Sequence, residues 1–210
     1  MRPALIGVLC AVLLVAPGPA AASNWYEEAE PLPIVAGRVE DSPQIANVMR
    51  SLASELLADP TLLSALRQAS GENDDFTVDT IIQRDIAWRL QSKRGRGPLL
   101  ESVLGGGLSQ RLTLLRFPRQ ALLSDLMLTD DRGLLVGATR IPSDYDQSDE
   151  AKYMVPVTSE PGMVHVEDAA YDESADDYVV MASILLVDPA DTRPLGVLCV
   201  NFTLAALQRD

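Results

Sequence analysis

"YVVMASILLVDP", residues 178–189, is a long apolar run in the second half of the sequence, and it predicts a central β-strand. A turn rich in Asp, Thr and Pro leads from it into a second apolar run, "LGVLCVNF", residues 195–202. Two such runs separated by a short polar turn are expected to pair side by side. Together they predict the centre of a sheet.

Further strands are predicted on the amino-terminal side of this pair. The stretch "LMLTDDRGLLVGAT", residues 126–139, contains two apolar runs separated by a polar segment that ends in Gly133, a pattern typical of a β-hairpin. "MVHVED", residues 163–168, alternates between apolar and polar positions. We therefore expect about five strands in mostly antiparallel order.

The first half of the sequence favours helices instead. Ser42 can cap a helix that begins at Pro43, and apolar residues follow at helical spacing as far as Leu56. Asp59 and Pro60 repeat this capping pattern and predict a second helix that should stop near Gly71. A third helix is predicted over residues 78–90, and the three glycines at 105–107 are expected to form a flexible connection. Helices in one block and strands in another indicate the α+β class.

Asp85 lies on the same stripe of the third predicted helix as Ile81 and Trp88, where a buried carboxylate needs a partner. An intrahelical pair with Arg89, four residues later, is one interpretation. The other is that Asp85 faces a pocket.

The amino terminus predicts export. Arg2 precedes an uncharged run to Ala22 whose apolar part is too short for a bilayer span, and small residues at 20–22 suit a signal peptidase. We expect residues 1–22 to be a signal peptide that is removed near Ala22, residues 23–41 to be an extended lead-in, and residues 42–210 to form a single domain. The mature protein would be periplasmic or secreted in a bacterium, without insertion into the membrane.

Charge and side-chain chemistry exclude several classes of function. The net charge is −13, and loss of Arg2 with the signal peptide makes it −14, which argues against nucleic acid and anionic lipid as partners. Cys199 would then be the only cysteine, so we expect no disulfide and a core that holds the fold by itself. His165 is the only histidine and no nucleophile elbow is present, so we expect no enzymatic activity and no cofactor.

Two polar segments follow predicted strands. "SDYDQSDEAKY", residues 143–153, has four carboxylates in a connection of about 23 residues, and loops of such length are often functional or contain a short helix. "DAAYDESADDY", residues 168–178, is the second segment. We expect the two to form the sides of one pocket.

These segments resemble the bacterial extracytoplasmic sensor domains called Cache or PDC domains, which are similar to the PAS sheet. The resemblance rests on the Asp-Tyr-x-Gln-x-Asp-Glu-x-Lys run at 144–152, the Asp-Glu-Ser element at 172–174 and the strand "RPLGVLCVNF" at 193–202, and it covers roughly residues 42–207. It implies a PAS-like antiparallel sheet with a long amino-terminal helix packed along it.

The resemblance also implies a function. Such domains bind small polar molecules such as amino acids, carboxylates or amines, and here would signal through a separate transmembrane receptor or kinase, because no second membrane helix or output module follows. The ligand-binding residues that it implies are Tyr145, Gln147, Asp149, Lys152, Tyr153, Asp172 and Ser174, with the two tyrosines as aromatic walls. The alternative for Asp149, Glu150 and Lys152 is that they pair with each other or cap a short helix.

Two other functions stay open. An acidic loop suits calcium, although the run starting at Asp144 lacks the glycine and the final glutamate of an EF-hand, so we predict no metal ligands but leave a calcium-binding module as an alternative. The same domain with a filled pocket would be a docking protein of the cell envelope, recognisable by an exposed apolar patch.

Overall fold

The centre of the fold is the pair of strands predicted from the two apolar runs. The computed structural model describes residues 43–172 and 175–208, so the predicted signal peptide, the lead-in and Ser42 lie outside the described residues. β5 (Asp177–Val187) and β6 (Pro194–Thr203) pair antiparallel along almost their whole length. Both strands are buried because neighbours cover their two faces.

The sheet has six strands, all paired antiparallel. Its order is β2-β1-β6-β5-β3, and β4 also pairs with β5. The other strands are β1 (Leu123–Thr129), β2 (Leu135–Ala138), β3 (Val164–Val166) and β4 (Ala170–Asp172). The predicted hairpin at 126–139 is confirmed as β1 and β2, and the α+β class is confirmed with one strand more than expected.

The helices occupy the first half of the chain, as predicted, but there are more of them. They are α1 (Pro43–Ala58), α2 (Pro60–Asn73), α3 (Val78–Arg94), α4 (Pro98–Leu104), α5 (Gly107–Arg116) and the short 3-10 helix η2 (Phe117–Arg119). α6 (Ala151–Val157) and α7 (Leu204–Leu207) follow within the strand-rich half.

The ends of these helices have recognisable causes. Asp59 caps α2 as predicted, because its Oδ1 accepts a hydrogen bond from the Thr61 amide at 2.9 Å. α3 ends at Gly95, whose φ of 66° is the left-handed conformation that glycine adopts without strain. The glycine connection is shorter than expected, since Gly105 and Gly106 form the turn between α4 and α5 while Gly107 begins α5.

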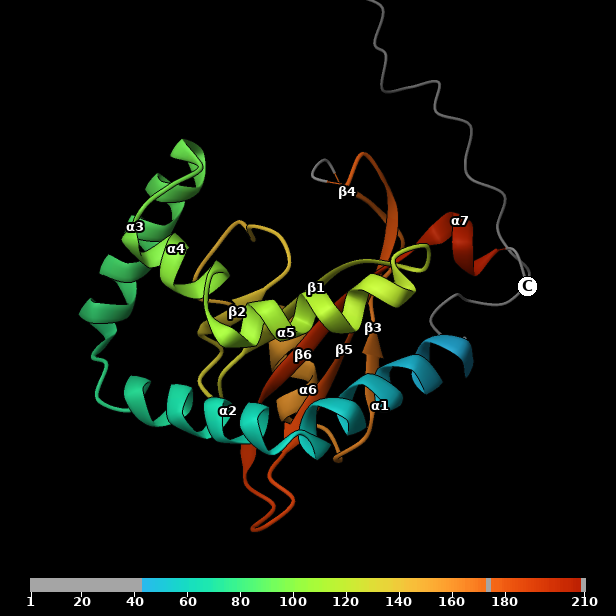
Figure 1. The fold of residues 1–210 in the computed structure, drawn as a ribbon, viewed down its shortest axis with the longest axis horizontal. Coiled ribbons are helices and arrows are strands. Elements are labelled where there is room, and N and C mark those ends of the chain that lie inside the picture. The colour runs from blue at the N-terminus through green and yellow to red at the C-terminus, as the bar shows by residue number, and fades with distance from the viewer. Residues whose placement is uncertain (1–42, 173–174, 209–210) are drawn as a thin grey trace, which may run out of the picture. The chain divides into compact units, whose positions relative to one another are not determined.

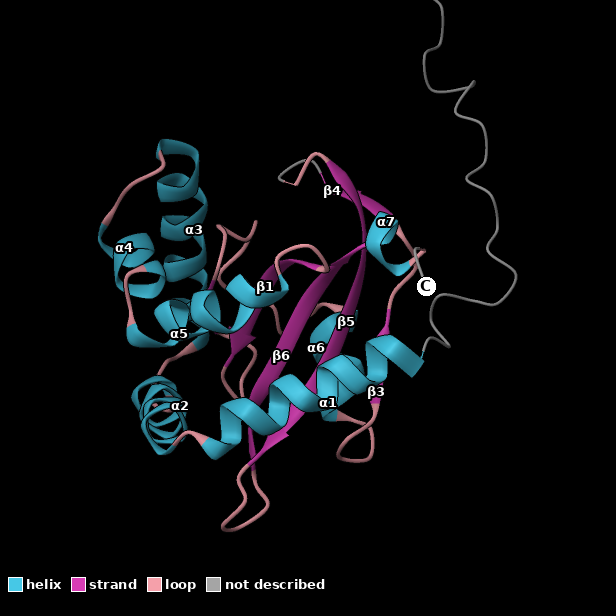
Figure 2. Ribbon diagram, turned by 45° about the vertical axis from the view of Figure 1, so that its right-hand side comes forward, coloured by secondary structure: helices cyan, strands magenta, loops and turns pink. Residues whose placement is uncertain are grey.

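The two faces of the sheet are covered differently. α1, α2 and α5 lie across one face (Figure 1), which we call the helix face, and their leucines form one core cluster with alternate residues of β1, β5 and β6. α6 packs on the opposite face, behind β5 and β6 in Figure 2, where a second cluster includes Trp88, Tyr145 and Tyr153. We call this the cavity face, because it holds the cavity described below.

Candidate functional site

Three adjacent strands present polar and sulfur-containing side chains to the cavity face. Because side chains alternate between the two faces of a strand, Asp125 and Met127 of β1 point to the same side, as do Cys199 and Asn201 of β6. The strand register places Asp125 opposite Asn201, and Asn201 opposite Met181 of β5. The strands therefore build the floor of a site from residues distant in the sequence.

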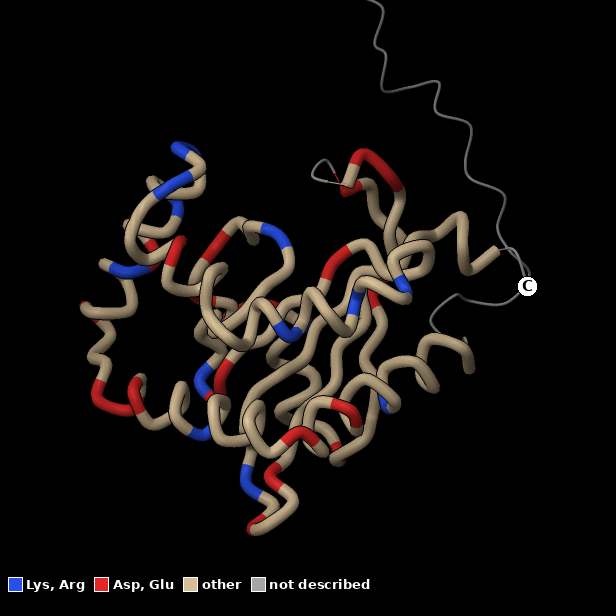
Figure 3. The backbone as a smooth tube through the Cα atoms, viewed as in Figure 1, with Lys and Arg blue, Asp and Glu red and all other residues tan. Residues whose placement is uncertain are grey.

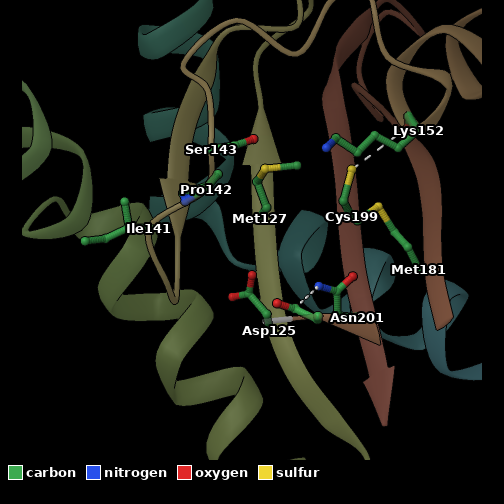
Figure 4. A pocket seen from close by; sticks show the side chains of 10 residues that line it. Asp125, Met127, Ile141, Pro142, Ser143, Lys152, Met181, Cys199 and Asn201 are labelled. Carbon is green, nitrogen blue, oxygen red and sulfur yellow. Dashed lines mark hydrogen bonds between the residues drawn. The ribbon is translucent and has the colours of Figure 1, made fainter. Parts of the chain in front are cut away.

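A cavity of about 350 Å³ lies over this floor (Figure 4). Its walls come from the segment Ile141–Ser143 after β2, from Lys152 of α6 and from Asp172 of β4. Ligand pockets in proteins usually have ~300–1,000 Å³, so this volume suits a molecule the size of an amino acid.

One end of the cavity gathers oxygen atoms. Asn201 Nδ2 donates a hydrogen bond to Asp172 Oδ2 at 3.3 Å, and Asn201 Oδ1 is buried with no hydrogen-bond partner among the described residues. Asp125, beside Asn201 in Figure 4, accepts a hydrogen bond from the Thr139 hydroxyl. Burial raises the pKa of Asp125 above its ordinary value, and the hydrogen bond from Thr139 opposes part of that rise. This end is suited to accept hydrogen bonds from an ammonium group.

The opposite end carries the cationic group of the cavity. The Lys152 side chain, only 11% exposed, lies above Cys199 in Figure 4, and its Nζ is 2.7 Å from Glu150 Oε2. This ion pair within the loop is the structural alternative that the sequence left open for Lys152. The ammonium group still borders the cavity, so it can also meet a ligand carboxylate.

Sulfur atoms form the apolar middle of the floor. Met127 and Met181 flank Cys199, as Figure 4 shows. Cys199 is 3% exposed, and burial raises the pKa of its thiol to about 12. The prediction that Cys199 is a core residue rather than a nucleophile agrees with this burial, because the reactive form of a cysteine is the thiolate.

The wall formed by Ile141–Ser143 is held from α3. Trp88 is fully buried, and its Nε1 donates a hydrogen bond to the Pro142 carbonyl at 2.9 Å. α3 also holds the following residues, since the Tyr145 amide donates to Asp85 Oδ1 at 2.9 Å. α3 thus positions one side of the cavity without lining it.

The two interpretations of Asp85 are both realised. Arg89 Nε lies 2.8 Å from Asp85 Oδ2, which is the predicted intrahelical pair, and 2.9 Å from Asp144 Oδ1. Asp85 also borders a hollow on the protein surface, separate from the cavity, that is lined by four acidic residues of the loop at 144–150 and by four residues of α3. We call it the acidic hollow.

The acidic loop uses many of its polar groups to fix its own shape. Asp146 Oδ1 accepts from the Ser148 amide at 3.0 Å, and Gln147 Nε2 donates to the Asp144 carbonyl at 2.8 Å. Gly133 has a φ of 83° and no room for a side chain, because an added Cβ would lie 2.8 Å from Ser148 Cα. This close approach lets the β1–β2 turn support the loop from below.

The predicted ligand-binding residues fall into separate environments. Lys152 and Asp172 line the cavity from opposite sides, so each of the two polar segments contributes to it. Tyr145, Gln147 and Tyr153 are buried and do not line the cavity, Asp149 lines the acidic hollow, and Ser174 lies outside the described residues. The expectation of an aromatic wall at Tyr145 is therefore not met, because its ring packs in the core against Trp88 at a centroid distance of 6.2 Å.

Burial affects Tyr153 as well. Its hydroxyl donates a hydrogen bond to the Asp131 carbonyl at 2.6 Å, and burial raises the pKa of Tyr153 to about 12. This residue joins α6 to the β1–β2 turn, which is a structural role.

The sequence predictions missed several cavity residues, notably Asp125, Asn201 and Met181. Asp125 and Asn201 are polar residues inside apolar strands, and this interruption is the signal that could have identified them.

Two kinds of feature are absent from the described ranges, 43–172 and 175–208. No group of three or more His, Cys, Asp or Glu side chains there is placed to hold a metal ion. No helix in the same ranges is long and apolar enough to cross a membrane.

No protein-family model matches the sequence, and no curated protein matches it. Solved structures are similar in fold. The ligand-binding domain of the Campylobacter jejuni chemoreceptor Tlp3 in complex with L-valine is 16% identical, with a TM-score of 0.40 over 80% of this chain and 66% of that one. The Escherichia coli DcuS sensor domain is 13% identical, with a TM-score of 0.44 over 79% of this chain and 92% of that one.

A third similar structure is the ligand-binding domain of the Pseudomonas aeruginosa amino acid chemoreceptor PctC in complex with GABA. It is 16% identical, with a TM-score of 0.38 over 78% of this chain and 60% of that one. These are sensor and ligand-binding domains, the class that the sequence resemblance names. The chain spans less than two thirds of the Tlp3 and PctC domains.

Proposed function

We propose that this protein is an exported, non-catalytic sensor domain that binds a small polar metabolite in the cavity on the cavity face. The observation that carries the proposal is the arrangement of Asp125, Asn201 and Asp172 at one end of a cavity of about 350 Å³, with Lys152 bordering its other end. Hydrogen-bond acceptors at one end of a cavity and a cationic group at the other are typical of a binding site for a polar molecule.

The chemistry of the two ends favours an amino acid. Its ammonium group would donate hydrogen bonds to the Asp125 and Asp172 carboxylates, and its carboxylate would meet Lys152. Met127 and Met181 supply an apolar surface for the side chain, and unbranched thioethers adapt to different shapes. A simple amine would use only the acidic end, and an organic acid only the end at Lys152.

The first test is thermal unfolding of the purified protein against a panel of amino acids, amines, organic acids and calcium. A ligand at 100 times its dissociation constant adds about 2.7 kcal/mol to the free energy of unfolding, which shifts the midpoint measurably. We expect amino acids to give the largest shift. A shift with calcium alone would contradict the proposal and favour the metal alternative.

Variants then locate the site. We expect Asp172→Asn to lower the affinity for the ligand at least about tenfold by calorimetry, because a charge-assisted hydrogen bond is lost. Asp149→Asn is the matched control: it removes a carboxylate from the acidic hollow, outside the cavity, and should leave the affinity unchanged. Equal effects of the two variants would place the ligand elsewhere.

The remaining parts of the proposal concern location and signalling. Export predicts that the mature protein from the cell envelope or medium begins at Ser23, which intact-mass measurement would show. Signalling through a separate membrane receptor or kinase follows from the family resemblance. It predicts that deletion of the protein abolishes a cellular response to the identified ligand, and that Asp172→Asn fails to restore it.

A further inference from the structure

α3 exposes an apolar stripe that the proposed sensor function does not use. Val78, Ile82, Ile86 and Leu90 are 72%, 48%, 47% and 50% exposed. Residues four apart lie on one face of a helix, so the four side chains form a continuous stripe along it. The other side of α3 is anchored by Trp88, which is fully buried. The stripe is therefore a fixed surface, and such a surface on a soluble protein often marks an interface.

The charges at the two ends of α3 are opposite. The exposed acidic residues Asp74, Asp75 and Asp79 lie at its beginning, and the exposed basic residues Lys93, Arg94 and Arg96 lie at its end. Figure 3 shows this separation, with red backbone where α2 leads into α3 and blue backbone at the far end of α3. A helix that is acidic at one end and basic at the other is complementary to an antiparallel copy of itself.

The positions of these residues are also symmetrical. In an antiparallel helix pair centred on position 84, residues equally distant from the centre lie opposite each other. Val78 then faces Leu90, and Ile82 faces Ile86. Between these pairs Asp79 faces Arg89, and the acidic turn that precedes the helix, with Asp74 and Asp75, lies near Lys93 at the end of the second copy.

From this symmetry we propose that α3 is the interface of a homodimer, in which it packs antiparallel on α3 of a second copy of this chain. Every apolar residue of the stripe would meet an apolar residue, and the charges at one end of the helix would meet opposite charges on the second copy. The surface is therefore complementary to itself, as an interface on a two-fold axis must be. A parallel arrangement would instead place Asp79 beside Asp79 and Lys93 beside Lys93. Antiparallel packing also aligns the two helix dipoles favourably.

The predicted dimer is a weak one. A single helix from each copy buries less surface than a standard stable interface of about 1,600 Å². Both copies are strongly acidic, and the carboxylates of the acidic hollow lie beside Ile82 and Ile86, so repulsion opposes the contact. The association should depend on protein concentration. It is best measured near 0.15 M salt, because a Debye length of about 8 Å screens the long-range repulsion between the two acidic copies.

The first experiment tests the antiparallel register by disulfide cross-linking. A mixture of the Val78→Cys and Leu90→Cys variants should form a cross-linked dimer, because these positions face each other across the interface. Each variant alone should not, since two copies of position 78 would be about 18 Å apart along the axis, twelve residues at 1.5 Å each. Cys199 is buried and should not interfere. Cross-linking of either single variant as readily as the mixture would overturn the antiparallel arrangement.

The second experiment reverses charges. Lys93→Glu should weaken dimerisation at least about tenfold in sedimentation equilibrium, because the new carboxylate at position 93 would lie near the acidic turn at Asp74 and Asp75. Adding Asp75→Lys to the same chain should restore it, since the pair is then complementary in the opposite sense. Both positions are exposed, and an unchanged thermal midpoint would show that folding is intact. A protein that stays monomeric up to about 1 mM, where even a weak interface associates, or a double variant that fails to restore association, would overturn the proposal.

Discussion

The two faces of the sheet are built from the same strands but serve different purposes. On the helix face, Leu198, Val200 and Phe202 of β6 are fully enclosed by the leucines of α1, α2 and α5. On the cavity face, the intervening residues Cys199 and Asn201 border a cavity. Neighbouring residues of one strand therefore belong to the core and to the candidate site in alternation.

The comparison shows how a small domain can hold a polar cavity with no disulfide among its described residues. The helix face supplies the larger of the two apolar cores, and burial of its side chains makes a large favourable contribution to the free energy of folding. The cavity face can then keep Asp125 half-buried although burial disfavours its ionised form. Four predictions test this division.

The largest effect concerns the reactivity of Cys199, the thiol in the floor of the cavity. With a pKa of about 12, roughly one thiol in ten thousand is ionised at pH 8. Alkylation by iodoacetamide should therefore be about a thousandfold slower in the folded protein than in the urea-unfolded chain, measured by mass spectrometry. Similar rates in the two states would mean that the cavity face is loosely packed, and the comparison of the faces would fail.

The second prediction compares the two faces directly. Leu198→Ala, on the helix face, should lower the free energy of unfolding by about 3 kcal/mol, because it leaves a void in a closely packed core. Met181→Ala, on the cavity face, should cost about 1 kcal/mol, since the side chain is only partly buried and borders a cavity already. Urea unfolding followed by circular dichroism measures both values, and equal costs would argue against the division.

Asp125→Asn should separate stability from binding. The variant keeps an oxygen that can accept the Thr139 hydrogen bond but removes a half-buried charge, so stability at pH 7 should rise by about 0.5–1 kcal/mol. Because the pKa of Asp125 is raised, its ionisation in the wild-type protein costs stability at neutral pH, and the gain should disappear as the pH falls below the ordinary pKa. Unfolding curves at several pH values would show this, while ligand affinity at pH 7 decreases. A loss of stability at pH 7 would show that the charge supports the fold.

The smallest effect belongs to an ion pair on the helix side. Arg67 of α2 holds Asp188 through two contacts of 2.6 Å, and this hydrogen bonding lowers the pKa of Asp188 to about 2. A lowered pKa stabilises the fold above the ordinary value of 3.8, and that contribution is lost as the pH falls towards 2. The Arg67→Gln variant should therefore lose less stability on acidification between pH 4 and 2 than the wild-type protein. Identical acid profiles, measured by fluorescence, would show that the pair is not coupled to folding.

Much of the fold could be predicted from local patterns. The alternation and apolar runs identified β1, β2, β3, β5 and β6, and cap residues such as Asp59 identified the helices. α4 and α5 were missed because Gly105, Gly106 and Gly107 are poor helix formers, and packing on the sheet overrides that preference. Tertiary contacts of this kind leave no local signal.

The site was harder to predict than the fold. Lys152 and Asp172 were identified from their polar segments, but Tyr145 and Gln147 belong to the same segment as Lys152 and are buried away from the cavity. A sequence shows which residues share a loop, whereas the direction of each side chain depends on how the loop folds back on α3 and the β1–β2 turn. The floor residues Asp125 and Asn201 become neighbours only through the register of β1 and β6.

The alternation along β6 has a consequence for how this protein can change over generations. Positions 199 and 201 border the cavity, while positions 198, 200 and 202 pack against the helices of the helix face. The two sets alternate with a period of two, and Asn201, which is only partly buried, is the position of this strand where a substitution disturbs the packing least. If the proposed site is correct, selection on ligand preference would act on one side of β6 and selection on the helix-face core on the other.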